Sequence, residues 1–215
     1  MSDGEEQPGD PPCHAHLIIG GHLVDRQTFR VVSRFRKSER LRLYARRKQL
    51  SHTERQAATE ALSAHLLHLL EARSFETIAA YWPIRGEPDL RPLMAALCQL
   101  GKTVLLPIVA AREAPLIFRP WYPGCDMVRG LWNIPVPASG EPQAPDIVLA
   151  PVVGIDRDLY RFGNGGGYYD RTLAGLPARP FVIGAGFSFS RIPTIFPMGW
   201  DVSMDVGVSE KGVTP

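Results

Sequence analysis

The chain has 215 residues, of which 45% are hydrophobic and 21% charged, so we expect one folded domain with a substantial core rather than a disordered chain. The formal net charge of +2 is too small to indicate nucleic-acid or membrane binding, and no apolar run approaches the length of a membrane helix. Three widely spaced cysteines are not a disulfide framework and are typical of a reducing compartment, so we expect a cytoplasmic protein.

The N-terminal part divides into three segments. Residues 1–16 are acidic and rich in proline and glycine, which predicts a disordered tail that cannot bury enough apolar surface to fold. Residues 17–32 form an extension for which the pattern predicts neither a helix nor a strand. Residues 33–48 are expected to form a helix, and their many basic side chains suit either a solvated face or an anion-binding surface.

Two further helices are marked by their ends. Ser51-His-Thr-Glu54 is a capping-box pattern, and it predicts the start of the second helix. A third helix is expected over residues 89–100, with Gly101 as its C-terminal stop. The inward positions are Ala58, Leu62, Leu66 and Leu69 in the second helix and Leu90, Leu93, Met94 and Leu97 in the third.

Strands alternate with these helices along the chain. The alternation predicts a single α/β domain over residues 33–215, with a mainly parallel sheet flanked by helices on both faces in a Rossmann-like three-layer arrangement. Residues 122–145 hold many prolines and glycines and are expected to form a long surface excursion. Ligands of such sheets bind at the carboxyl ends of the strands. The strands are expected over residues 77–82, 103–108, 116–121, 146–153 and 181–187.

The most informative segment runs from Arg161 to Arg171 and has the sequence RFGNGGGYYDR. Four of the five residues from Gly163 to Gly167 are glycines, which leave the backbone free to turn its N–H groups into one concavity. A helix is expected to start near Tyr168 and adds its positive end to that concavity. With an arginine on each side, the segment predicts a phosphate-binding loop rather than a flexible linker.

Two common phosphate-binding patterns do not fit this chain. The dinucleotide fingerprint G-x-G-x-x-G, started at Gly163, requires a glycine where Tyr168 stands. Gly101-Lys-Thr103 is similar to the end of a Walker A motif, but Ala96 occupies the position of its first glycine and a strand follows. The glycine loop therefore belongs to neither class.

The loop resembles the G-x-G-x-G-Y-Y-D signature of the 5-formyltetrahydrofolate cyclo-ligases, also called 5,10-methenyltetrahydrofolate synthetases. The resemblance extends from Arg34 to the C-terminus, and further motifs follow in the family's order. These motifs are the basic helix with Arg36, Lys37, Arg40 and Arg46, the turn Gly86-Glu87-Pro88-Asp89, the segment Trp132-Asn133-Ile134-Pro135, and Trp200-Asp201-Val202.

The resemblance implies an enzyme that uses ATP and Mg²⁺ to convert 5-formyltetrahydrofolate into 5,10-methenyltetrahydrofolate, with release of ADP and phosphate. In that reaction the formyl oxygen attacks the γ-phosphate, and the folate N10 then attacks the phosphorylated carbon. The substrate supplies both nucleophiles, so the protein has only to position groups and stabilise charge. We therefore expect a small-molecule substrate, and a monomer that binds neither nucleic acid nor a membrane.

The resemblance also implies a role for individual residues. Arg161 and Asp170 are the expected catalytic residues, and Asp170 and Asp201 are the expected Mg²⁺ ligands. Glu87 is expected to contact the polar edge of the pterin. Trp82, Trp132 and Tyr168 offer aromatic surface to the folate rings, although each is equally typical of core packing. The expected ATP-binding residues are Arg36, Lys37, Arg40, Arg161, Gly163, Asn164, Gly165, Gly166, Gly167, Tyr168 and Tyr169.

Some positions depart from the family's pattern. Leu159 stands where a glycine is usual, Arg36 replaces a lysine, and Asn164 stands where a larger aromatic or basic residue is common. Two other functions also fit the sequence: a non-catalytic nucleotide- or RNA-binding paralogue, and an ATP-dependent ligase acting on another formylated or thiamin-like compound. The presence of Glu87, Asp170 and Asp201 favours catalysis, because a binding module does not need all three.

Overall fold

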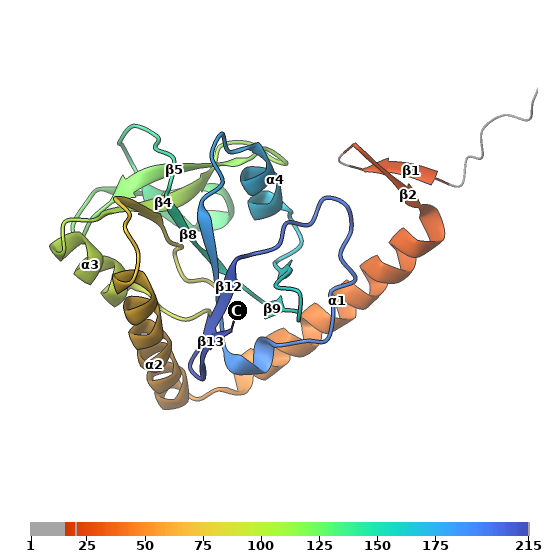
Figure 1. Ribbon diagram of the computed structural model, residues 1–215, viewed down its shortest axis with the longest axis horizontal. Helices are drawn as coiled ribbons and strands as arrows, with labels where there is room; N and C mark the ends of the chain where they lie inside the picture. The colour runs from red at the N-terminus through yellow and green to blue at the C-terminus, as the bar shows by residue number, and fades with distance from the viewer. Residues whose placement is uncertain (1–15, 20, 215) are drawn as a thin grey trace, which may run out of the picture.

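The computed structural model describes residues 16–19 and 21–214. The predicted disordered tail lies outside these residues, except for His16, which opens strand β1 (His16–Ile19). The extension without a predicted element contains β1, strand β2 (His22–Asp25) and the first turns of helix α1 (Arg26–Gln49). Figure 1 shows this hairpin at the far end of α1, away from the main sheet.

A seven-stranded sheet forms the centre of the fold, in the order β13-β12-β11-β8-β3-β4-β5. The five inner strands run parallel, and the two edge strands run antiparallel to their neighbours. This confirms the predicted mainly parallel α/β sheet. The strands are β3 (Thr77–Ala79), β4 (Thr103–Val109), β5 (Leu116–Trp121), β8 (Ile147–Pro151), β11 (Phe181–Ala185), β12 (Val206–Ser209) and β13 (Gly212–Thr214).

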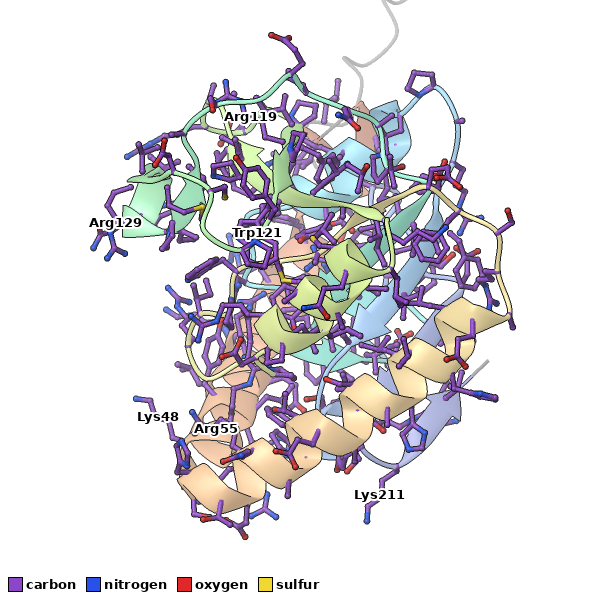
Figure 2. The ribbon with its side chains drawn as sticks, turned by 90° about the vertical axis from the view of Figure 1, so that its left-hand side faces the viewer. Lys48, Arg55, Arg119, Trp121, Arg129 and Lys211 are labelled. Carbon is purple, nitrogen blue, oxygen red and sulfur yellow. The ribbon has the colours of Figure 1, made fainter. Side chains whose placement is uncertain are left out.

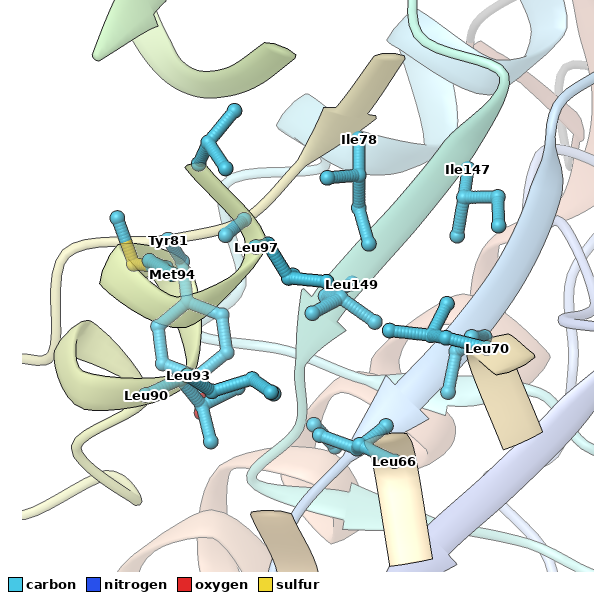
Figure 3. Close-up of a cluster of buried hydrophobic side chains, with 14 of the residues drawn as sticks. Leu66, Leu70, Ile78, Tyr81, Leu90, Leu93, Met94, Leu97, Ile147 and Leu149 are labelled. Atoms are coloured by element: carbon cyan, nitrogen blue, oxygen red, sulfur yellow. The ribbon is translucent and has the colours of Figure 1, made fainter. Parts of the chain in front are cut away.

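Helices cover both faces of this sheet. On one face lie α2 (His52–Glu71) and α3 (Arg91–Gln99), whose leucines pack in one cluster with Ile78 and Leu149 of the central strands. Figure 3 shows these side chains converging between helices and strands. On the other face α4 (Tyr168–Gly175) contributes to a second cluster around the outward residues of the same strands. The three-layer prediction is therefore confirmed.

The first two helices begin at side-chain caps. Asp25 accepts a hydrogen bond from the backbone N–H of Thr28 (2.7 Å), so α1 begins at Arg26, seven residues earlier than its basic stretch suggested. The predicted capping box is confirmed at Ser51 and Glu54, where both reciprocal hydrogen bonds form.

Several predicted boundaries are wrong in detail. In α2 the buried residue of the last turn is Leu70, and Leu69 is only half-buried. Strand β3 ends at Ala79 rather than at position 82, because the chain leaves the sheet there to form a wall of the site described below. The excursion over residues 122–145 contains two short strands and a 3₁₀ turn. They are β6 (Met127–Arg129), η1 (Leu131–Asn133) and β7 (Pro135–Pro137).

Some elements near the C-terminus had no counterpart in the prediction. They include β12 and β13, in which glycines interrupt the apolar pattern, so that neither segment shows the continuous run typical of a buried strand. A small antiparallel pair, β9 (Gly154–Ile155) and β10 (Arg161–Phe162), leads directly into the glycine loop. The short η2 (Ser188–Ser190) lies against α1.

Candidate active site

A cavity of about 390 Å³ lies where the carboxyl ends of β3, β4 and β8 meet. Leu106, Pro107 and Pro151 contribute its strand-borne wall, and the residues that follow β3 form a second wall. The glycine loop and the start of α4 form a third. The parallel topology thus brings together segments distant in the sequence at the sheet edge where a ligand is expected.

A tight acidic turn places a carboxylate inside this cavity. Arg85 and Gly86 take left-handed backbone angles, with φ of 50° and 73°, and fold the chain back so that Glu87 faces inward. Glu87 is only 4% exposed, and its carboxylate accepts a hydrogen bond from the N–H of Ile84 (3.0 Å). Burial raises the pKa of Glu87 above its usual value, and the Ile84 N–H together with Arg47 and Arg161 opposes that rise.

Behind Glu87 lies a buried arginine that the sequence analysis did not single out. Arg47 is 1% exposed, its Nη1 is 4.0 Å from Glu87 Oε1, and its Nη2 donates to the carbonyl of Val152 (2.7 Å). Its Nε and Nη1 are buried without hydrogen-bond partners among the described residues. Burial lowers the pKa of Arg47, and Glu87 opposes this effect. Periodicity could have found this residue, since it lies eleven positions after Arg36 on the same helix face.

The C-terminal end of α1 is held from a second helix. Arg55 of α2 lies beside this end in Figure 2, and its Nη2 donates to the carbonyls of Arg47 and Leu50 (both 3.3 Å). Lys48, the next residue after Arg47, is exposed and points away from the molecule in the same view. Of these two adjacent cations of α1, Arg47 is therefore buried and Lys48 is exposed to solvent.

Aromatic side chains cover the other walls of the cavity. Trp132 and Tyr168 meet edge to face, with ring centroids 5.5 Å apart, and Trp82 lines the side next to the acidic turn. Trp132 is 58% exposed at a backbone φ of 56°, so core packing does not account for its position. Tyr169 is buried, and its hydroxyl has no hydrogen-bond partner among the described residues. These flat surfaces suit a planar ring system.

The glycine loop begins at β10 and ends at the N-terminus of α4. Gly167 takes a left-handed conformation (φ 65°), and no side chain caps the helix, so its first N–H groups have no side-chain acceptor there. Arg40 of α1 donates from Nε to the carbonyl of Gly163 (2.9 Å), which anchors the loop to the first helix. Leu159, in the turn before the loop, has a φ of 62°, the conformation that the glycine usual at this position adopts without strain.

Arg161 links the loop to the first turn of α4. Its guanidinium lies 4.7 Å from the Tyr169 ring centroid and pairs with Asp170 (3.3 Å). The other carboxylate oxygen of Asp170 accepts from the N–H of Val202 (3.3 Å), so Asp170 and Asp201 come from adjoining segments. Asp201 in turn accepts two hydrogen bonds from Arg36, at 2.5 and 3.2 Å.

Residues 32–210 match the model of the 5-formyltetrahydrofolate cyclo-ligase family. The chain belongs to this family. A 5-formyltetrahydrofolate cyclo-ligase of Mycolicibacterium smegmatis is 34% identical over 153 residues, which cover 67% of this chain and 77% of that protein. Another, of Haemophilus influenzae, is 27% identical over 165 residues, covering 74% and 88%. A solved structure of Aquifex aeolicus 5,10-methenyltetrahydrofolate synthetase aligns with a TM-score of 0.72 and 31% identity over 83% of this chain and 91% of that one.

Family membership identifies the chain as an enzyme, a ligase of folate one-carbon metabolism. The family match also confirms the resemblance seen in the sequence, because the matched residues include the glycine loop, the acidic turn and the basic helix. The hairpin β1-β2 and the first six residues of α1 lie outside the match. In the part of the chain that the structure describes, no helix is long and apolar enough to cross a bilayer.

The cyclo-ligase residues predicted from the sequence fall into two sets. Those that line the cavity are Trp82, Glu87, Trp132, Arg161, Asn164, Gly166, Gly167, Tyr168 and Tyr169. Those that do not line it are Arg36, Lys37, Arg40, Gly163, Gly165, Asp170 and Asp201. Lys37 is exposed on α1. The wall also contains Tyr81 and Arg85, which carried no signal of their own in the sequence.

The donor chemistry bears on the predicted Mg²⁺ site. Within residues 16–19 and 21–214, no three His, Cys, Asp or Glu side chains gather in a way that could hold a metal ion. Asp170 and Asp201 supply hard oxygen ligands, but each also pairs with an arginine. This set fits a Mg²⁺ ion that arrives with nucleotide phosphates, since such an ion takes one or two carboxylates and completes its shell with phosphate and water.

Proposed function

We propose that this enzyme uses ATP and Mg²⁺ to convert 5-formyltetrahydrofolate into 5,10-methenyltetrahydrofolate, with release of ADP and phosphate. The observation that carries the proposal is the composition of one cavity. A buried carboxylate, Glu87, lies at its acidic turn, aromatic side chains line its walls, and a glycine loop with Arg161 closes it. A pterin needs the first two features and a triphosphate needs the third.

The folate is held by Glu87 and the aromatic walls. An ionised carboxylate accepts hydrogen bonds from the N–H groups of a pterin edge, and such charge-assisted bonds are stronger than neutral ones. Trp82, Trp132 and Tyr168 exclude water from the rings and orient them. The formyl group then lies toward the glycine loop, because Glu87 fixes the opposite edge of the pterin.

The phosphates are held by the loop and the basic helix. The N–H groups of Gly163 to Gly167 and the start of α4 face the triphosphate, and Arg36, Lys37 and Arg40 supply positive charge from α1. Arg161 stabilises the charge that develops as the formyl oxygen attacks the γ-phosphate. Folate N10 then attacks the phosphorylated carbon and releases its proton to water, a ring closes, and phosphate leaves with both bonding electrons of the C–O bond.

Asp170 and Asp201 are the residues that would hold Mg²⁺. The ion, when bound, neutralises charge on the phosphate oxygens and helps to orient them for transfer. Arg36 and Arg161 keep the two carboxylates in place through their ion pairs. We also expect the active form to be a monomeric cytoplasmic enzyme acting on a small molecule.

The experiment mixes purified protein with 5-formyltetrahydrofolate, ATP and Mg²⁺ and follows the absorbance of the methenyl product. We expect product and ADP in equal amounts, and none when ATP is omitted or when Arg161→Ala replaces the wild type. Nucleotide binding without any product would instead favour a non-catalytic paralogue. ATP consumption with a different formylated compound alone would favour a related ligase.

A further inference from the structure

A chain of polar contacts crosses one side of the cavity and joins the acidic turn, the first helix and the glycine loop. Arg85 Nη1 donates to the hydroxyl of Tyr44 (3.2 Å), and this hydroxyl donates to Oδ1 of Asn164. Burial raises the pKa of Glu87, and the side chain of Asn164, which lines the same cavity, is among the groups that oppose this rise. Tyr44 belongs to α1, whereas Arg85, Glu87 and Asn164 all line the cavity.

The chemistry of the Asn164 amide determines the direction of donation in this series of hydrogen bonds. Asn164 has one acceptor oxygen and two N–H donors, and Tyr44 occupies the oxygen. The NH₂ group is therefore the only part of the Asn164 side chain that can donate to the carboxylate of Glu87. The hydrogen bonds run in one sense from the Arg85 guanidinium through Tyr44 to Asn164, an arrangement in which the first bond polarises the second.

The position of Asn164 depends on α1. Glycines stand on both sides of it, at positions 163 and 165, and leave the backbone of the loop many conformations. Two contacts from one face of α1 restrict it: Arg40 holds the carbonyl of Gly163, and Tyr44, one turn later, holds the side chain of Asn164. A change in the loop thus moves Asn164, which lines the same cavity as Glu87.

We propose that Asn164, held by the Tyr44 hydroxyl, is a positioning residue that couples nucleotide binding at the glycine loop to folate binding at Glu87. The inference rests on the proposed function and adds a specific consequence to it. Phosphates that order the loop also fix the Asn164 amide next to Glu87. The carboxylate of Glu87 is then already oriented when folate binds. Coupling of this kind is reciprocal, so folate must strengthen nucleotide binding by the same factor.

The test measures the dissociation constant of 5-formyltetrahydrofolate by calorimetry, with and without a non-hydrolysable ATP analogue and Mg²⁺. For the wild type we expect the analogue to tighten folate binding by about fivefold or more, the lower range of measured couplings between sites. In Tyr44→Phe and in Asn164→Leu this factor should fall to less than about twofold. The double variant should lose no more than either single one, because both act on one chain of contacts.

The matched control is Tyr122→Phe, which removes the same hydroxyl from a tyrosine that is 59% exposed and distant from the loop in sequence. It should keep the full coupling. The proposal is overturned if the wild type binds both ligands without coupling, or if Tyr44→Phe keeps the full coupling factor, whatever its melting temperature. Absence of methenyl product in the wild type is a separate result that contradicts the proposed function, and failure to bind folate at all contradicts both.

Discussion

The two halves of helix α1 carry equal numbers of Lys and Arg but lie in different surroundings. Five lie in residues 26–37 and five in residues 38–49. In the first half most of them are exposed, as is Val31, which is 59% exposed. In the second half Leu43 and Arg47 are each 1% exposed, and Arg40 holds the glycine loop.

The contrast shows that basic composition does not assign a role to a helix face. What distinguishes Arg47 from the exposed Arg46 beside it is burial against a carboxylate, Glu87, that comes from another segment. A buried cation without such a partner destabilises a fold, because it loses its hydration and gains nothing in return. The second half of α1 therefore lies behind the cavity wall that holds Glu87, whereas the hairpin end of α1 lies at the surface.

The largest effect on stability is expected at Arg47, in the most deeply buried part of the second half of α1. Arg47→Met removes the cation paired with the buried carboxylate of Glu87 and should lower the free energy of unfolding by about 3–5 kcal/mol. Denaturant unfolding measures this. The control, Arg46→Met, removes an exposed cation of the same helix and should change that free energy by less than about 0.5 kcal/mol. Equal effects of the two variants would contradict the distinction between buried and exposed cations.

The next effect concerns the ion pair between Arg36 and Asp201, which lies near the boundary of the two halves. If Asp201 also binds Mg²⁺ in the catalytic complex, Asp201→Asn should lower turnover at least about 100-fold, since even indirect partners of a metal reach that factor. Added Mg²⁺ should restore part of the loss. In contrast, a residue that only pairs with Arg36 would cost stability and show no response to Mg²⁺. The exposed Asp158→Asn is the control.

Glu87→Gln tests the carboxylate that gives the second half its role. The variant should weaken folate binding about tenfold or more, because a hydrogen bond to a charged group contributes about 1.5–3 kcal/mol. ATP affinity measured in the absence of folate should stay within about twofold, since no direct phosphate contact is lost. A fall in ATP affinity with unchanged folate affinity would show that the role of Glu87 is misassigned.

The same variant should also change the pH dependence of stability. Because burial raises the pKa of Glu87 above 4.5, the folded state binds this proton more tightly than the unfolded chain does. The stability that the proton contributes is complete below pH 4.5 and is lost as the pH rises through the raised pKa. Glu87→Gln has no such proton, so its free energy of unfolding should fall less than that of the wild type above pH 4.5. Parallel curves would contradict a raised pKa.

The smallest effect is expected at the hairpin end. Ile18 and Leu23 are cross-strand partners and are 76% and 74% exposed, so Leu23→Ser should change the free energy of unfolding by less than about 0.5 kcal/mol. Turnover should not change. A chain that starts at Leu17 should likewise keep its melting temperature and activity. A large loss in either case would place the N-terminal extension in the functional part of the enzyme.

Local patterns in the sequence were enough to predict much of this protein. Apolar patterns predicted five strands of the sheet and helices α2 and α3, the Ser51 capping box marked the start of α2, and the glycine loop marked a segment that lines the cavity. Leu90 and Leu97 are buried as their spacing required. These features depend on residues within a few positions of one another, so that neighbouring side chains largely determine them.

The tertiary structure alone decided which polar residues face one another. Arg47 against Glu87, Arg36 against Asp201, and Tyr44 against Asn164 join segments far apart in the chain. No local pattern marks such a pair, because an arginine or tyrosine on a helix suits solvent equally well. The energy of each polar group depends on its partner and on how deeply the pair is buried. Both are set only when folding places the carboxyl ends of the sheet strands beside α1.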